Sequence, residues 1–151
     1  MSFITKIFDM DLEALVPPLD SVLSSIQVIL TILLLVGPLA MMILGALYLR
    51  FAPPEANYKF GFRVYFGMGS VEAWKYAQKM AGIAFWVVGF VLTVAMIVVA
   101  VGFGSQDAFQ MAQTALICLL WQVGAAILVR LVVGILCAIY FNPDGTRRGE
   151  D

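Results

Sequence analysis

The chain contains no histidine, only two cysteines and few charged residues, which make up 13% of it. Because histidine and cysteine supply most ligands to structural and catalytic zinc, the composition argues against a metal centre of that kind. Soluble domains carry roughly a quarter charged residues, whereas 62% of this chain is apolar. The composition therefore predicts an integral membrane protein.

Other features of an active site are also missing. The apolar runs hold no pair of carboxylates, and Gly61, Gly67 and Gly69 do not follow a dinucleotide or phosphate-loop pattern. Cys118 and Cys137 lie on one predicted helix, about 28 Å apart at about 1.5 Å per residue, which is beyond the reach of a disulfide. We predict no enzyme activity, no catalytic residue, no cofactor and no metal.

Three long apolar runs dominate what is present. Each reaches the roughly 20 residues that a helix needs to cross a hydrocarbon core, and none shows the short alternating strands of a β-barrel. Because a backbone in lipid must satisfy its own hydrogen bonds, we predict an all-α integral membrane bundle of three transmembrane helices. The predicted parts are a membrane domain at 21–141 with spans near 22–49, 81–103 and 112–141, a loop at 50–80 and a tail at 142–151.

The positive charges lie unevenly along the chain. Lys and Arg residues cluster in the loop 50–80 and in the tail, whereas the connection 104–111 has none and the first 20 residues are acidic. Since cations in short loops favour the cytoplasmic side, we predict the N-terminus outside and both the loop and the tail in the cytoplasm. The net charge of −1 gives no reason to expect a nucleic-acid partner.

The segment 1–20 precedes the first span and is predicted to lie outside. It does not fit a signal peptide, because the residues before Val22 are acidic and the apolar run that follows them is too long. Phe3, Ile7 and Met10 share one face of a helical projection, which predicts an interfacial helix over 1–16, with an irregular segment as the alternative. We expect Asp20 or Ser21 to cap the first span.

Two local signals predict how the helices bend and begin. Gly37-Pro38 predicts a kink in the first span, which we interpret as a packing bend, with a hinge or gate as the alternative. Ser70 is a good N-cap and Glu72 falls in the favourable first turn, so one helix is predicted from about Val71 to Phe103.

The loop carries a spaced motif that continues into the second span. Its members are Asn57, Gly61, Arg63, Ser70, Trp74, Gln78 and Gly82. This pattern resembles that of the SdpI family of bacterial membrane proteins, which reads approximately N-x-x-x-G-x-R-T, a turn with serine, then W-x-x-x-N and a glycine that opens a span. Val64 and Gln78 stand where the family usually has Thr and Asn. The match covers residues 57–82, and the flanking helices agree only in hydropathy.

The resemblance implies a multi-pass protein of the bacterial cytoplasmic membrane with an immunity or signalling role. Such a protein protects against a membrane-active antimicrobial peptide and signals through a cytoplasmic regulator. We predict that Asn57, Arg63, Ser70 and Trp74 form a hydrogen-bonded hook that holds the loop on the bundle. An ordered loop with interfacial anchors and no ligand is the alternative. A small transporter, channel or scaffold subunit is the rival function.

Gln122 and Arg130 are polar residues deep within the third apolar run. Arg130 is near its middle, where a cation costs about 2.5–3.5 kcal/mol on insertion scales, and it shares a stripe with Ala126, Gly134 and Cys137. An anionic ligand, a lipid phosphate reached by snorkelling and another subunit are the open explanations. Three helices would cover Gln113, Gln122 and Arg130 poorly, which favours a homo-oligomer.

Overall fold

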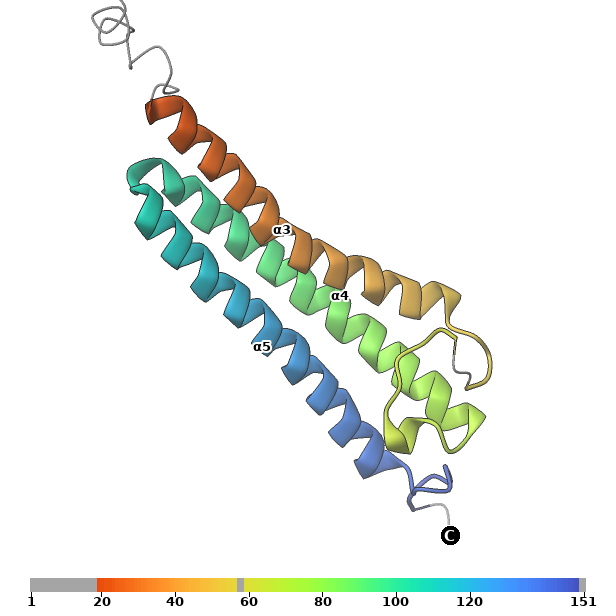
Figure 1. Ribbon diagram of the computed structural model, residues 1–151. Coiled ribbons are helices and arrows are strands. Elements are labelled where there is room, and N and C mark those ends of the chain that lie inside the picture. The colour runs from red at the N-terminus through yellow and green to blue at the C-terminus, as the bar shows by residue number, and fades with distance from the viewer. Residues whose placement is uncertain (1–18, 57–58, 150–151) are drawn as a thin grey trace, which may run out of the picture.

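Three long helices account for most of the chain, and the computed structural model describes residues 19–56 and 59–149. They are α3 (Leu19–Phe51), α4 (Val71–Val101) and α5 (Ala108–Tyr140), with short 3-10 helices η1 (Tyr65–Gly67) and η2 (Gly102–Ser105) between them. Figure 1 shows an elongated bundle in which successive long helices run in opposite directions. The predicted all-α fold is confirmed, and the predicted interfacial helix lies outside the described residues.

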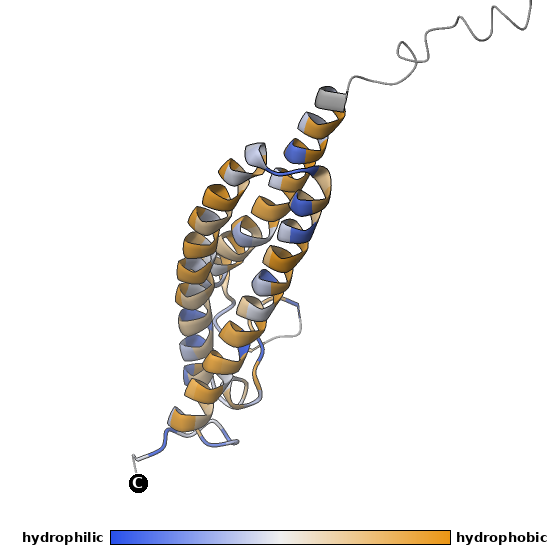
Figure 2. Cartoon of the chain, turned by 90° about the vertical axis from the view of Figure 1, so that its left-hand side faces the viewer, coloured by the Kyte–Doolittle hydropathy of each residue, from blue (hydrophilic) through white to orange (hydrophobic). Residues whose placement is uncertain are grey.

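All three long helices are apolar and long enough to cross a membrane. Figure 2 shows that apolar residues cover most of their length. Large aliphatic side chains point outward, and Val98 on α4 and Leu120 on α5 are 68% and 64% exposed. Because such a surface suits lipid rather than water, the chain is a multi-pass membrane protein.

The two ends of the bundle differ in charge. The loop 52–70 and the C-terminal turn lie together at one end, and η2 lies at the other (Figure 1). We call the first the basic end. Its cations are Arg50, Lys59, Arg63, Lys75, Lys79, Arg147 and Arg148. The loop and the tail thus share one end of the bundle, an arrangement that the predicted topology requires.

The starts of α4 and α5 follow ordinary capping chemistry. The Ser70 hydroxyl accepts a hydrogen bond of 3.1 Å from the Ala73 N–H at the start of α4, as predicted. Asp107 caps α5 in the same way. The prediction for the first span is wrong, because α3 already includes Leu19, so that Asp20 and Ser21 lie within the helix and do not precede it.

A bend divides α3 near its middle (Figure 1), where Pro38 lies inside the helix. Proline has no N–H, so the Leu34 carbonyl loses its partner four residues on. The Gln122 amide of α5 replaces it, because its Nε2 donates to the Leu34 oxygen at 3.0 Å. Gly37 makes room for this contact, since a Cβ there would collide with the Gln122 Oε1. A side chain of a neighbouring helix therefore supplies the hydrogen bond that the kink removes. Gln122 is only 5% exposed.

α3 and α4 approach most closely where both present glycine. A Cβ on Gly45 would lie 2.7 Å from the Gly82 oxygen and 2.6 Å from the Trp86 nitrogen. Small residues let the backbones of membrane helices approach closely, and Gly45 and Gly82 do so here. Nearer the basic end, α5 buries Val133 and Cys137 against α4 and the loop in one apolar core.

Candidate functional site at the basic end

The loop between α3 and α4 packs into the bundle instead of running over its surface. Its residue Phe62 is 5% exposed and belongs to the same core as Val133 of α5. The Phe62 ring meets the rings of Tyr48 and Phe85 edge-on, with both centroids 5.9 Å away. Edge-to-face contacts of this kind are favourable beyond the area that they bury. One side chain of the loop therefore contacts all three long helices.

Gln78 of α4 fixes the backbone of that buried residue. Its Oε1 accepts from the Phe62 N–H at 2.8 Å, and its Nε2 donates to the Phe62 carbonyl at 2.7 Å. The side-chain amide thus pairs with both polar groups of one peptide residue, as a neighbouring strand would. Gln78 is 3% exposed. A buried loop needs such a partner, because an unsatisfied backbone group would destabilise it by about 1–3 kcal/mol.

Trp74 holds the loop at two further points. Its Nε1 donates to the Pro53 carbonyl at 2.8 Å, and its ring is completely buried. The loop crosses this ring at Gly61, whose φ of 129° favours glycine. A Cβ at that position would lie 2.5 Å from two carbon atoms of the ring. Gly61 is therefore required both by its backbone conformation and by its distance from Trp74.

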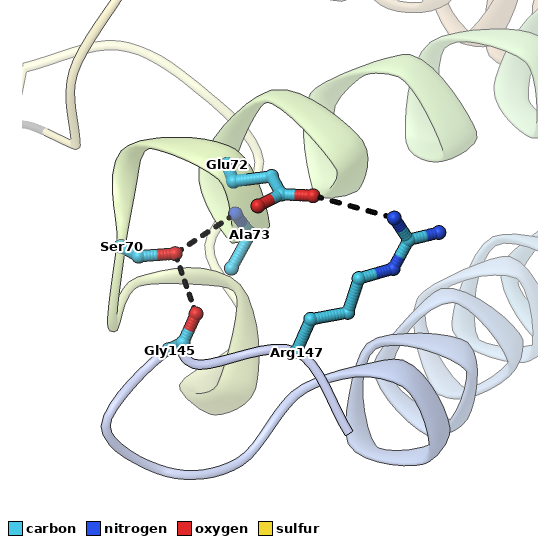
Figure 3. Close-up of polar contacts among 5 residues, drawn as sticks. All are labelled: Ser70, Glu72, Ala73, Gly145 and Arg147. Carbon is cyan, nitrogen blue, oxygen red and sulfur yellow. Dashed lines mark hydrogen bonds and ion pairs between the residues drawn. The ribbon is translucent and has the colours of Figure 1, made fainter. Parts of the chain in front are cut away.

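Ser70 connects α4 to the tail. Besides accepting from the Ala73 N–H, its hydroxyl donates to the Gly145 carbonyl at 2.7 Å (Figure 3). A looser ion pair of 3.7 Å joins Arg147 to Glu72 beside it. The start of α4 thus holds the C-terminal turn as well as the loop.

The tail itself forms a closed turn. The Asp144 carboxylate accepts from the Thr146 N–H at 3.0 Å and from the Thr146 hydroxyl at 2.7 Å. These bonds favour the charged form and hold the pKa of Asp144 below its ordinary value. The turn closes with a hydrogen bond from the Arg148 N–H to the Tyr140 carbonyl.

The predicted hook differs from the contacts in the structure. Trp74 does hold the loop, but Ser70 bonds to the tail, and Asn57 lies outside the described residues. Gln78 pairs with the loop although the predicted hook omitted it. Gly82 lies further along α4 and serves the contact with α3. Arg63 is half-buried in the loop.

The sequence contained a signal for part of this arrangement. Ser70, Trp74, Gln78 and Gly82 are spaced by four residues and so share one face of α4. We call the set Gly61, Trp74 and Gln78, together with the loop that they hold, the loop clamp. The hydrogen-bond partners Pro53 and Phe62 carry no signal in the sequence, because they act through backbone atoms.

Gln122 and Arg130 of α5 lie in separate surroundings. Gln122 is buried at the kink of α3, whereas Arg130 is exposed and lies beside the packing stripe of α5. The Arg130 guanidinium carbon is 6.0 Å from the centre of the Phe62 ring, within the range of a cation–π contact. Gln113 is also exposed. The expectation that Gln113, Gln122 and Arg130 would be poorly covered is therefore wrong for Gln122.

Searches of protein-family models, curated proteins and solved structures return no match to this chain. The likeness to the SdpI family therefore depends on the motif residues alone. Among residues 19–56 and 59–149, no group of three or more metal-binding side chains comes together.

Proposed function

We propose that this protein is a non-catalytic bacterial membrane protein of the immunity type, which binds a membrane-active peptide and signals to a cytoplasmic partner. The observation that carries the proposal is the loop clamp. Three residues of the SdpI-like motif meet in one buried unit, where Gly61 lies on Trp74 and Gln78 holds Phe62. A motif whose members make one structure is better explained by a shared role than by chance spacing.

The clamp offers a physical route from membrane to cytoplasm. Phe62 touches Tyr48 of α3, Phe85 of α4 and Arg130 of α5. A peptide that changes the packing of these helices changes the contacts of Phe62 and with them the loop. The coupling requires that the peptide bind one helix arrangement better than another. The charge asymmetry supports a cytoplasmic location for the basic end.

A groove near the opposite end suits the peptide. Its volume is about 350 Å³, and it lies between α3 and α4, lined by Gln27, Thr31, Leu35, Ile97, Ala100 and Val101. Most of this lining is apolar, but Gln27 brings a side-chain amide to a surface that lipid covers. Because lipid tails offer no hydrogen bonds, that amide favours an amphipathic peptide with a polar group of its own.

A challenge assay tests the proposal. A peptide-sensitive bacterium that expresses the chain should survive membrane-active peptides at concentrations that kill the same strain with an empty vector. The rival transporter function predicts solute flux in proteoliposomes. The burial of Gln122 against Leu34 speaks against a water-lined path at that position. Flux without protection would overturn the immunity proposal.

A further inference from the structure

Two pockets flank the first turns of α4 at the basic end. The tail pocket has a volume of about 430 Å³ and is lined by Glu72, Lys75, Tyr76, Lys79, Tyr140, Phe141 and Arg147. The loop pocket, of about 370 Å³, is lined by Tyr48, Leu49, Ala52, Pro53, Pro54, Lys75, Gln78 and Lys79. Lys75 and Lys79 line both. These two lysines are one helical turn apart and separate the two pockets.

The position of these lysines along α4 gives their depth. The stretch Met80–Val101 carries no charge and is about 33 Å long at about 1.5 Å per residue. A bilayer core is about 30 Å thick. When this stretch fills the core, Lys79 lies at its boundary and Lys75 one turn further out. That is the layer in which the phosphate groups of lipids lie.

The tail pocket has a surplus of positive charge. Among the described residues that line it, Lys75, Lys79 and Arg147 face the single carboxylate of Glu72. Within the described part of the chain, neither lysine forms an ion pair. Arg147 pairs with Glu72 at 3.7 Å, near the limit for such a contact, and both side chains are about half-exposed or more (Figure 3). An anion can therefore compete with Glu72 for Arg147.

The remaining walls of the pocket are ordered and aromatic. The Tyr76 ring lies 5.5 Å from both the Tyr140 and the Phe141 ring, measured between centroids. Phe141 and Arg147 are joined by an isolated β-bridge, so the tail backbone that carries Arg147 is fixed beside the rings. Aromatic rings and cations at this depth suit the glycerol and phosphate region of a lipid.

We propose that the tail pocket is a binding site for the headgroup phosphate of an anionic glycerophospholipid. Lys75 and Lys79 bind the phosphate oxygens, and Arg147 leaves Glu72 to join them. Tyr76 and Tyr140 pack against the glycerol, and the acyl chains leave along the exposed apolar surface of α5. This site is independent of the peptide and the partner of the proposed function.

Native mass spectrometry of the intact chain tests this site. The protein is released from nanodiscs that contain equal amounts of phosphatidylglycerol and phosphatidylcholine, and the retained lipids are counted. We expect the wild type to retain phosphatidylglycerol preferentially. Each of Lys75→Gln and Lys79→Gln should lower that preference about fivefold, the size of one cation–anionic lipid contact. Arg50→Gln removes a cation from the same end without touching either pocket, so it should retain the preference.

Two further measurements separate a lipid from free phosphate and from general attraction. Inorganic phosphate at millimolar concentration should leave the retained phosphatidylglycerol unchanged, and Glu72→Gln should raise the preference by removing the competing carboxylate. If Arg50→Gln and Lys79→Gln lowered the preference for phosphatidylglycerol equally, general surface charge would explain the effect and the site would be overturned. Displacement of the lipid by inorganic phosphate would overturn its identity as a lipid site.

Discussion

The hydrogen bond between Gln122 and the kink of α3 leads to a prediction about interhelical coupling. Pro38 leaves the Leu34 carbonyl without its usual donor, and the Gln122 Nε2 lies 3.0 Å from that oxygen. Leu34 is fully buried, so no solvent reaches the carbonyl region from outside. Gln122→Leu should therefore lower the free energy of unfolding by about 1–2 kcal/mol, the upper range for hydrogen bonds between membrane helices.

The second half of the prediction comes from Pro38→Ala. An alanine supplies the missing N–H, so the Leu34 carbonyl regains a donor within α3. In the Pro38→Ala variant, Gln122→Leu should lower the free energy of unfolding much less than it does in the wild type. The double-mutant cycle over Pro38 and Gln122 should thus give a coupling energy of about 1 kcal/mol.

Unfolding in mixed micelles of dodecyl sulfate and a mild detergent, followed by tryptophan fluorescence, measures the four free energies. Gln113→Leu is the matched control, because the Gln113 side chain is exposed on the same helix and makes no hydrogen bond within the described residues. It should leave stability unchanged or raise it. Additive effects of Pro38→Ala and Gln122→Leu would refute the reasoning, since Gln122 would then not serve the carbonyl that proline leaves open.

Three further predictions concern the basic end. Gly61→Ala should destabilise the protein by about 1–3 kcal/mol through its strained backbone and its clash with Trp74, measured by the same unfolding assay. Gly104→Ala, where a Cβ meets nothing, should change little. Arg130→Leu should insert at least as well as the wild type, because it removes a cation from the span. In the unfolding assay, where both states stay in the micelle, it should lower the free energy of unfolding by about 0.5–1 kcal/mol through loss of the contact above Phe62, and a higher free energy of unfolding would contradict this. The pKa of Asp144, measured by carbon NMR, should lie below its ordinary value of 3.8. Because the folded pKa is lowered, the charged carboxylate stabilises the tail turn above pH 3.8, and this stabilisation is lost as the pH falls through the folded pKa. A titration midpoint at or above 3.8 would contradict this.

Hydropathy and capping rules predicted most of the helices. The spans expected near 22–49, 81–103 and 112–141 fall within α3, α4 with η2, and α5 with the residue that follows it. The helix predicted from Val71 began there because Ser70 is a strong cap. Local chemistry decided these features, so a single sequence was enough.

The contacts between helices were harder to predict. When every face of a helix is apolar, hydropathy does not tell which face packs against the neighbouring helices and which face meets lipid. The partner of Gln122 is a carbonyl on another helix, and its availability depends on Pro38. The partners of Gln78 are likewise backbone atoms, those of Phe62 in the loop. Such bonds follow from packing and leave no mark in residue type.

The loop clamp is the centre of the functional account, and a pair of tryptophan variants tests it. Trp74→Phe keeps an aromatic ring against Gly61 but removes the Nε1 donor to the Pro53 carbonyl. Trp121→Phe makes the same change on α5, where the side chain is 72% exposed. Both variants should insert into the membrane.

Survival of a peptide-sensitive bacterium that expresses each variant, under challenge with membrane-active peptides, is the most direct measurement. The account predicts that wild type and Trp121→Phe protect, whereas Trp74→Phe, present in the membrane at the same level, loses protection. Full protection by Trp74→Phe, or none by the wild type against any peptide, would contradict the claim that the clamp carries an immunity function.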